Sequence, residues 1–182
     1  DGYPEYLGVT ATVLAGEETL GLSEEETTEA ARDFYASRGQ TISELTPFED
    51  VESIVTTILF AQENRLQEVG DLRELDSFTL GARPEFEERD QGFAGMQSVY
   101  GLTNGTYKNV NLDAAPNALL EGDIDVANMF STDARLASGE FKVLEDTEKI
   151  FGYQHVALVI DDEALEDLGG DDFMEVINEV NG

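Results

Sequence analysis

The chain has no cysteine, no tryptophan and a single histidine among its 182 residues. Without cysteine it can form no disulfide, no thiol nucleophile and no thiolate metal site, so the sequence carries no signal about its redox compartment. It also lacks an apolar run long enough to cross a bilayer, which excludes a membrane-spanning helix within this stretch. Because 41% of the residues are hydrophobic and 9% are aromatic, however, we expect a folded core.

Positive charge is also scarce. Ten Lys and Arg residues stand against forty Asp and Glu, which gives a formal net charge of -30. Such a chain repels nucleic-acid phosphates and anionic lipids, so a nucleic-acid partner is excluded. The acids are spread along the whole chain, which is typical of a protein from a halophile, because a Debye length of about 3 Å in molar salt screens their repulsion.

The sequence offers little for catalysis. His155 is its only imidazole, and no hydroxyl and carboxylate stand beside it in the sequence. There is no dinucleotide fingerprint, no phosphate-binding loop, no metalloprotease helix motif and no calcium-binding loop. We therefore predict that the protein is not an enzyme and that it uses no cofactor and no metal. Aromatic residues beside turns remain as candidates for lining a pocket.

Segments with helical periodicity alternate with short apolar runs. Ser23 and Glu26 form a capping box that begins a helix predicted over residues 24–38. Ser53 to Ala61 is a nearly continuous β-branched and apolar run, typical of a strand covered on both faces and hence of a parallel sheet. This alternation predicts an α/β fold, in which ligands lie beyond the carboxyl ends of the strands.

Other segments extend the same pattern. Further strands are predicted over residues 78–82, 107–112, 124–130, 141–144 and 156–160. Helices are predicted near residues 65–75, in the polar stretch around Phe86, over 115–120, and at the end of the chain, with Phe173, Val176, Ile177 and Val180 on one face. Asn104-Gly105 predicts a turn, and with Thr106 it matches the N-glycosylation pattern in an exposed position.

Several short motifs agree, in chain order, with one known family. They are Tyr3-Pro-Glu-Tyr-Leu-Gly8, then Glu85-Phe86 with Arg89 and Gly92, and then Leu120-Glu-Gly-Asp-Ile-Asp-Val-Ala127. The last continues into Phe130-Ser-Thr-Asp-Ala-Arg135 and Val143-Leu-Glu-Asp146. Together they resemble the substrate-binding proteins of osmoprotectant ABC importers, of the glycine betaine, carnitine and choline type.

The resemblance implies a type II periplasmic-binding-protein-like fold with two α/β lobes. Residues 1–61 and 158–182 would form the first lobe and residues 62–157 the second. In the family, a further segment with the first strands and a ligand contact precedes the Tyr-Pro-Glu-Tyr stretch, and a short C-terminal piece closes the first lobe. The resemblance therefore implies that this chain is N-terminally truncated and that its first lobe is incomplete.

The resemblance also implies a ligand site. Its aromatic box would comprise Tyr6 on the first lobe and Phe130 and Tyr153 on the second, and Arg89 matches an arginine that pairs with a ligand carboxylate. A quaternary ammonium group cannot donate a hydrogen bond and is held by ring faces, whereas a guanidinium fork suits a carboxylate. Thr57 occupies a ligand-site position that is aromatic in the family, and Val9 replaces a threonine.

The leading interpretation is the extracytoplasmic solute-binding component of an ABC importer. It would bind a quaternary ammonium compatible solute such as glycine betaine between its lobes and deliver it to a membrane permease. We would then expect an extracellular, cell-surface-associated protein whose anchor lies outside this chain. The alternative is a ligand-sensing domain of a regulator or receptor on the same scaffold, because a fold does not fix a function. A hydrolase has the least support.

Overall fold

The structure is a computed structural model that describes residues 2–11 and 22–181. The chain divides into two compact units: unit 1 comprises residues 1–50 and 152–182, and unit 2 comprises residues 51–151. These boundaries differ from those expected for the lobes. Residues 51–61 fall in unit 2, and residues 152–157 fall in unit 1. Each unit is described by itself.

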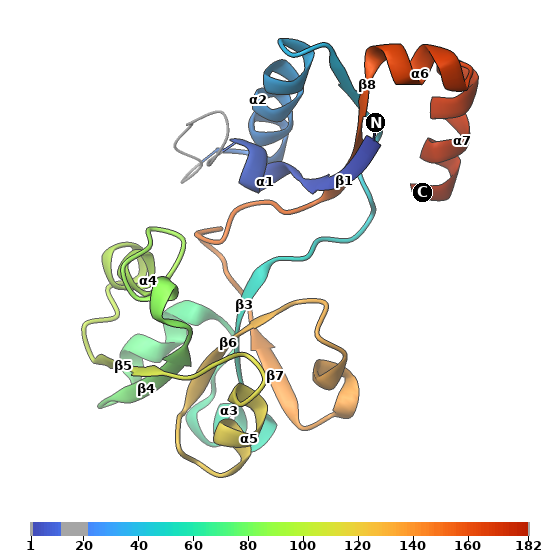
Figure 1. Ribbon diagram of the computed structural model, residues 1–182. Coiled ribbons are helices and arrows are strands. Elements are labelled where there is room, and N and C mark those ends of the chain that lie inside the picture. Colours follow the sequence, from blue (N-terminus) through green and yellow to red (C-terminus); the bar gives the residue numbers. More distant parts are fainter. Residues whose placement is uncertain (1, 12–21, 182) are drawn as a thin grey trace. The chain divides into compact units, whose positions relative to one another are not determined.

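Unit 1 is a small antiparallel sheet with helices (Figure 1). Its elements are β1 (Gly2–Tyr6), α1 (Leu7–Val9), α2 (Glu24–Ala36), β2 (Gln40–Ile42), β8 (Val156–Asp161), α6 (Asp162–Leu168) and α7 (Asp171–Asn181). β8 is the central strand and pairs antiparallel with both β1 and β2. Of these elements, the sequence did not predict β1, α1, β2 or α6.

Helix α2 begins where the sequence predicts it. The Ser23 hydroxyl accepts a hydrogen bond from the Glu26 backbone, and the Glu26 carboxylate accepts one from the Ser23 backbone, which confirms the capping box. Its buried face packs Ala31 and Tyr35 against Leu7, Val159 and other apolar residues of the unit. This is the core of unit 1, and Figure 1 shows α7 on the opposite side of the sheet from α2.

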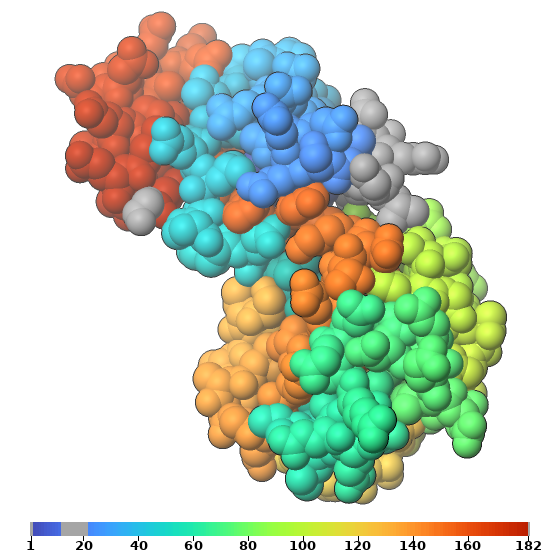
Figure 2. Space-filling view, turned by 180° about the vertical axis from the view of Figure 1, so that it is seen from behind, coloured from blue at the N-terminus to red at the C-terminus, as the bar shows by residue number. Residues whose placement is uncertain are grey.

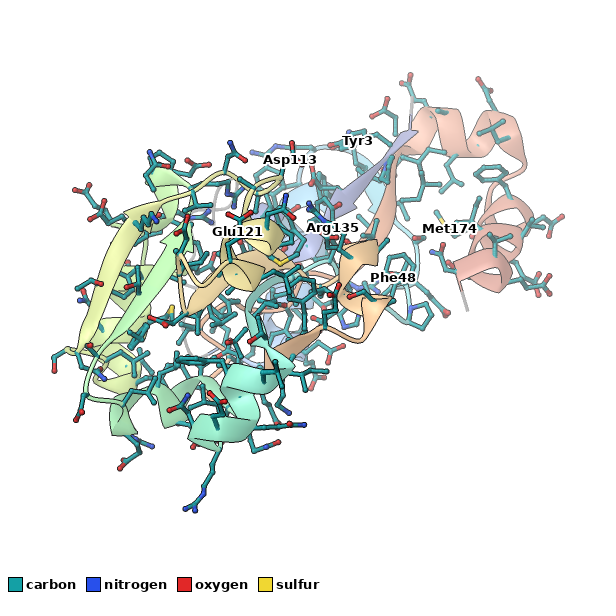
Figure 3. The ribbon with its side chains drawn as sticks, turned by 90° about the horizontal axis from the view of Figure 1, so that it is seen from below. Tyr3, Phe48, Asp113, Glu121, Arg135 and Met174 are labelled. Atoms are coloured by element: carbon teal, nitrogen blue, oxygen red, sulfur yellow. The ribbon has the colours of Figure 1, made fainter. Side chains whose placement is uncertain are left out.

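Unit 2 is built on a five-stranded sheet with the order β5-β4-β6-β3-β7. Its strands are β3 (Glu52–Thr57), β4 (Phe78–Ala82), β5 (Gly105–Asn109), β6 (Val126–Phe130) and β7 (Phe141–Leu144). Its helices are α3 (Ile58–Asn64), α4 (Phe93–Tyr100) and α5 (Ala115–Leu120), and its 3₁₀ helices are η2 (Val69–Glu74), η3 (Pro84–Phe86) and η4 (Ala134–Ser138). In Figure 2, green segments that follow α3 make up much of the visible face of unit 2, and orange segments lie beside them.

The sheet of unit 2 is mixed, so the expectation of a parallel sheet is wrong. β4 pairs parallel with β5 and β6, but β3 pairs antiparallel with β6 and β7. The apolar run 53–61 is also not one strand. Its first part is β3, and Thr57 then begins α3 by accepting a hydrogen bond at Oγ1 from the Phe60 backbone. Threonine therefore supplies a helix cap inside a run that resembles a buried strand.

Hydrophobic clusters cover both faces of this sheet. Ile54, Leu80 and Val126 belong to a cluster that includes η2, Phe86 and α4. Val55, Ala127 and Met129 point to the other face and pack with α5. β3 and β6 are therefore buried on both sides, as expected, although their pairing is antiparallel.

Several predicted segments have shorter bounds in the structure; the strand expected over residues 124–130, for example, begins at Val126. The helix expected near residues 65–75 is the 3₁₀ helix η2, and the strand expected over 107–112 is β5, which ends at Asn109. Asn104 does not lie free in an exposed turn, because its side-chain nitrogen donates to the backbone carbonyls of Leu72 and Leu75 at 2.9 and 2.7 Å. The amide therefore anchors η2 to the turn before β5.

Candidate functional site

The register of β3 and β6 places Glu52 directly opposite Phe130. Directly paired residues of antiparallel strands point to the same face, so the carboxylate and the ring share one face at one end of the sheet. Asn128, two residues before Phe130, also points there. Its Nδ2 donates to Glu52 Oε2 at 2.5 Å. This end of the sheet is also the carboxyl end of β4, where Arg83 follows the last strand residue, Ala82.

Arg83 joins this group through two contacts. Its Nη2 donates to Glu52 Oε1 at 2.5 Å, and its guanidinium carbon lies 5.2 Å from the ring centroid of Phe130. The Arg83 and Glu52 side chains are only 22% and 13% exposed, so their ion pair is partly shielded from water. We call Glu52, Arg83, Asn128 and Phe130 the strand-end cluster. It combines an aromatic ring, a guanidinium and a carboxylate.

The backbone at Arg83 is held in place by the surrounding elements. Its carbonyl oxygen accepts hydrogen bonds from the Phe86 backbone at 2.9 Å and from the Tyr107 hydroxyl. Phe86 is fully buried, and burial raises the pKa of Tyr107 to about 12, which keeps its hydroxyl protonated as a donor. β4, η3 and β5 therefore fix the position from which the Arg83 side chain extends.

Arg89 approaches the same carboxylate from a nearby loop. Its Nη1 lies 3.7 Å from Glu52 Oε1, and its side chain is 44% exposed. The loop is tight at Gly92, where an added Cβ would lie 2.3 Å from the carbonyl oxygen of Phe86. The Glu85-Phe86, Arg89 and Gly92 motif thus anchors this loop beside the cluster. The structure brings Arg89 and Phe130 to one group of side chains, with Glu52 as their common neighbour.

Two buried polar atoms in the cluster have no hydrogen-bond partner among residues 2–11 and 22–181. They are Nε of Arg83, which lies 3.6 Å from Glu85 Oε1, and Oδ1 of Asn128. A buried donor or acceptor without a partner is costly, so such atoms are rare in folded proteins. The cluster therefore retains unused hydrogen-bonding capacity. Chemically, it can offer donors to an anionic group and a ring face to a cation.

Thr57 lies away from this cluster. It is at the opposite end of β3 from Glu52, and its register with Phe141 places it on the other face of the sheet. It borders a cavity of about 610 Å³ that is lined by residues of α3, the end of α5 and the segment around Gly139. The structure therefore does not bring Thr57 together with Phe130 or Arg89.

Tyr6 and Tyr153 both belong to unit 1, whereas the resemblance implied that Tyr153 would share a lobe with Phe130. Tyr6 is paired with Val156 in the sheet, and an added Cβ on Gly8 would lie 2.4 Å from the carbonyl oxygen of Tyr153. The Tyr6 end of β1 and the Tyr153 segment are thus adjacent. The hydroxyl of Tyr6 donates to Asp50 Oδ2 at 3.0 Å, and this bond raises the pKa of Tyr6.

Acidic side chains surround this end of unit 1. Tyr153 borders a cavity of about 660 Å³ lined mainly by Glu24, Glu25, Glu29 and other residues of α2. His155 Nε2 lies 3.3 Å from Glu24 Oε1 and 3.6 Å from Glu49 Oε1, and its Nδ1 contacts the Thr46 carbonyl at 2.9 Å. The single imidazole therefore joins α2, a loop and β8, with no nucleophilic hydroxyl among these contacts.

Sequence reasoning missed three members of the cluster: Glu52, Arg83 and Asn128. Arg83 carried a usable signal, because it directly follows a predicted strand and the carboxyl ends of strands are where α/β folds bind ligands. Glu52 and Asn128 carried no such signal. Their side chains are neighbours only because β3 and β6 pair antiparallel, and the expected parallel sheet excluded this pairing.

Within residues 2–11 and 22–181, no helix is long and apolar enough to cross a membrane. The same part of the chain holds no group of three or more His, Cys, Asp or Glu side chains arranged to bind a metal ion.

Comparison with known proteins gives a consistent result. Residues 1–180 match the OpuAC family, described as the substrate-binding domain of ABC-type glycine betaine transport systems. A solved structure described as a glycine betaine/carnitine/choline ABC transporter has a TM-score of 0.79 and 25% sequence identity. That match covers 90% of this chain and 61% of the other, so this chain spans less than two thirds of that relative.

A second solved structure supports the same fold. Apo YehZ from Escherichia coli is 20% identical, with a TM-score of 0.74, and the match covers 100% of this chain and 69% of that one. At this identity the likeness establishes the fold alone. The chain has the α/β type II fold of periplasmic binding proteins, as the motifs implied.

Proposed function

The chain belongs to the family of substrate-binding domains of ABC-type glycine betaine transport systems, and from this membership we propose that it binds a quaternary ammonium compatible solute such as glycine betaine. The bound solute is delivered to the membrane permease of an ABC importer. On this proposal the protein acts outside the cytoplasm, at the cell surface. Its acidic composition suits a halophile, which must balance external salt with compatible solutes.

The strand-end cluster carries this proposal. Ten basic residues are present against forty acidic ones, yet the guanidinium groups of Arg83 and Arg89 both approach Glu52 beside an aromatic ring. A betaine has a quaternary ammonium group and a carboxylate. The ring of Phe130 offers a face to the ammonium group, and the guanidinium groups offer charge-assisted hydrogen bonds to the carboxylate.

Unit 1, taken by itself, offers two further rings as candidate contacts for a cation. Tyr6 and Tyr153 lie on adjacent segments, and the side chains around them are predominantly acidic. Such surroundings favour a cation over an anion. Thr57 is left out of the proposed site, because it lies on the other face and at the other end of the sheet from Phe130.

Calorimetric titration in molar salt tests the proposal. The full chain and its Phe130→Ala variant would be titrated with glycine betaine, carnitine and choline. Losing one ring from a cation site costs about 0.5–2 kcal/mol, so the dissociation constant of glycine betaine should rise about 2- to 30-fold.

Phe48→Ala is the matched control, because the Phe48 side chain is 55% exposed and lies outside the proposed site. Its affinity should equal that of the unaltered chain. Absence of heat with all three compounds would contradict the proposed function. Equal affinity in Phe130→Ala and Phe48→Ala would instead remove Phe130 from the site.

A further inference from the structure

We propose that Arg83 and Glu52 set the ligand selectivity of this protein: Arg83 binds the anionic group of a zwitterionic ligand, and Glu52 positions Arg83 and limits its attraction for that group. The inference rests on the proposed function and assigns roles to two residues that no motif indicated. It predicts a preference for carboxylate-bearing quaternary ammonium compounds over purely cationic ones.

The first support is the position of the Arg83 guanidinium. Its carbon lies 5.2 Å from the ring centroid of Phe130, so a positive charge already lies beside the ring proposed to hold the ammonium group. A ligand cation on this ring is therefore repelled by Arg83. A purely cationic ligand such as choline has no group that Arg83 attracts. A betaine offsets it, because its carboxylate is attracted to the same guanidinium.

The second support is unused donor capacity. A guanidinium has five N–H donors, and the short bond from Arg83 to Glu52 uses Nη2. Among the described residues, the Nε donor has no hydrogen-bond partner and lies 3.6 Å from Glu85 Oε1, but it is buried and is not itself open to a ligand. The Arg83 side chain as a whole is 22% exposed, so a ligand carboxylate can bind its remaining Nη donors without breaking the bond to Glu52. Arg83 is also less exposed than Arg89, at 22% against 44%, so salt screens its charge less.

The third support concerns Glu52. One of its oxygens accepts from Arg83 and the other from Asn128, so the carboxylate is held at both ends. Its side chain is 13% exposed, and its Oε1 also lies 3.7 Å from Arg89 Nη1. Glu52 thus neutralises part of the positive charge that would attract a ligand anion. Replacing it with glutamine retains the shape and removes this opposing charge.

The two residues therefore predict changes of opposite sign. Arg83→Gln should weaken glycine betaine binding about tenfold or more, because a charge-assisted bond is lost, and should leave choline binding equal or tighter. Glu52→Gln should strengthen glycine betaine binding relative to choline. If Arg83 and Glu52 had only a structural role, both variants would bind both ligands more weakly. The decisive readout is therefore the selectivity ratio, which is the dissociation constant of choline divided by that of glycine betaine.

The experiment is titration of the full chain with glycine betaine and choline in molar salt. The variants are Arg83→Gln, Glu52→Gln and the double variant, which keeps the net charge and guards against misfolding of a chain with one unpaired buried charge. Arg73→Gln and Glu74→Gln are the matched controls. That pair lies in the same unit at 3.9 Å, with side chains 55% and 81% exposed. Circular dichroism checks that each variant is folded.

A lower selectivity ratio in Arg83→Gln and a higher one in Glu52→Gln support the inference. If Arg83→Gln does not fold, the double variant replaces it. A selectivity ratio lower than that of the unaltered chain then supports the inference. A ratio equal to that of the control variants overturns it and leaves the proposed function standing. If the unaltered chain binds neither compound, the proposed function fails and this inference fails with it.

Discussion

The two units bury their sheets to different extents. In the described residues of unit 2, apolar clusters cover both faces of a five-stranded sheet, whereas the described apolar cluster of unit 1 lies on one face of three strands and Ile160 is buried on the other face. On α7 of unit 1, Val176 and Val180 are 56% and 78% exposed. Two-sided burial yields more hydrophobic free energy, so unit 2 should be the more stable part of the chain.

The units also differ in the charge beside their candidate ligand residues. In unit 2, guanidinium groups lie near Phe130, and Glu52 pairs with them. In unit 1, Tyr6 donates to Asp50 and Tyr153 borders the acidic face of α2. Cationic side chains thus lie beside the candidate ring of unit 2, and acidic side chains lie beside the candidate rings of unit 1.

The largest expected effect is loss of the fold on removal of salt. With a net charge of -30, repulsion among acidic side chains grows as the Debye length rises from about 3 Å at 1 M to about 30 Å at 0.01 M. Unit 1, with its smaller core, should unfold first. Hydrogen exchange followed during desalting should show loss of protection in α2 before loss in β4 and β6. Unchanged protection at low salt would contradict the halophile interpretation.

A substitution in each unit tests the difference in burial. Phe86 is fully buried in unit 2, so Phe86→Ala should lower the free energy of unfolding by about 3–5 kcal/mol. Val180 is 78% exposed in unit 1, so Val180→Ala should change it by at most about 0.5 kcal/mol. Denaturant unfolding in molar salt measures both. A large loss in Val180→Ala would show that α7 packs against something that its exposure does not reveal.

High pH compares a buried tyrosine of unit 1 with a partly buried tyrosine of unit 2. Burial raises the pKa of Tyr35 in unit 1 and of Tyr107 in unit 2 to about 12, from an ordinary value of 10.0. Between these pH values the unfolded chain loses phenolic protons that the folded protein keeps. The free energy of unfolding should therefore fall as pH rises from about 10 to about 12.

Tyr35→Phe and Tyr107→Phe should each make that decline less steep, whatever their effect at neutral pH. Unfolding in denaturant at a series of alkaline pH values measures the slope. A free energy of unfolding that stays constant over this range in the unaltered chain would show that neither phenol keeps its proton.

Local signals in the sequence predicted local structure well. The capping box at Ser23 predicted the start of α2, and α5 and β7 have the predicted bounds. The motif that ends in Ala127 combines several structural roles: Asp125 accepts from the Thr79 backbone at 2.7 Å, and Ile124 is buried. Periodicity and capping are properties of a few neighbouring residues, so they can be predicted without tertiary information.

Pairing between distant strands could not be predicted in the same way. An apolar run indicates burial on two faces, but it does not give the direction of the neighbouring strands. The parallel sheet expected from β3 was therefore wrong. For the same reason, Glu52 and Asn128 could not be predicted as site residues. They lie beside Phe130 only because β3 and β6 are antiparallel. Arg89 and Phe130 were identified through the family motifs, which carry information about distant residues.

The smallest expected effects come from the helix caps at Ser23 in unit 1 and Thr57 in unit 2. Each side-chain oxygen accepts a backbone hydrogen bond, at 3.2 Å from Glu26 and 3.1 Å from Phe60. Loss of such a cap costs about 0.5–2 kcal/mol, so both alanine variants should unfold at slightly lower denaturant concentrations. Thr57→Ala should also retain the affinity for glycine betaine, because Phe130 lies on the other face and at the other end of the sheet. Weaker binding in Thr57→Ala, but not in Ser23→Ala, would restore Thr57 to the ligand site and contradict its placement as a helix cap alone.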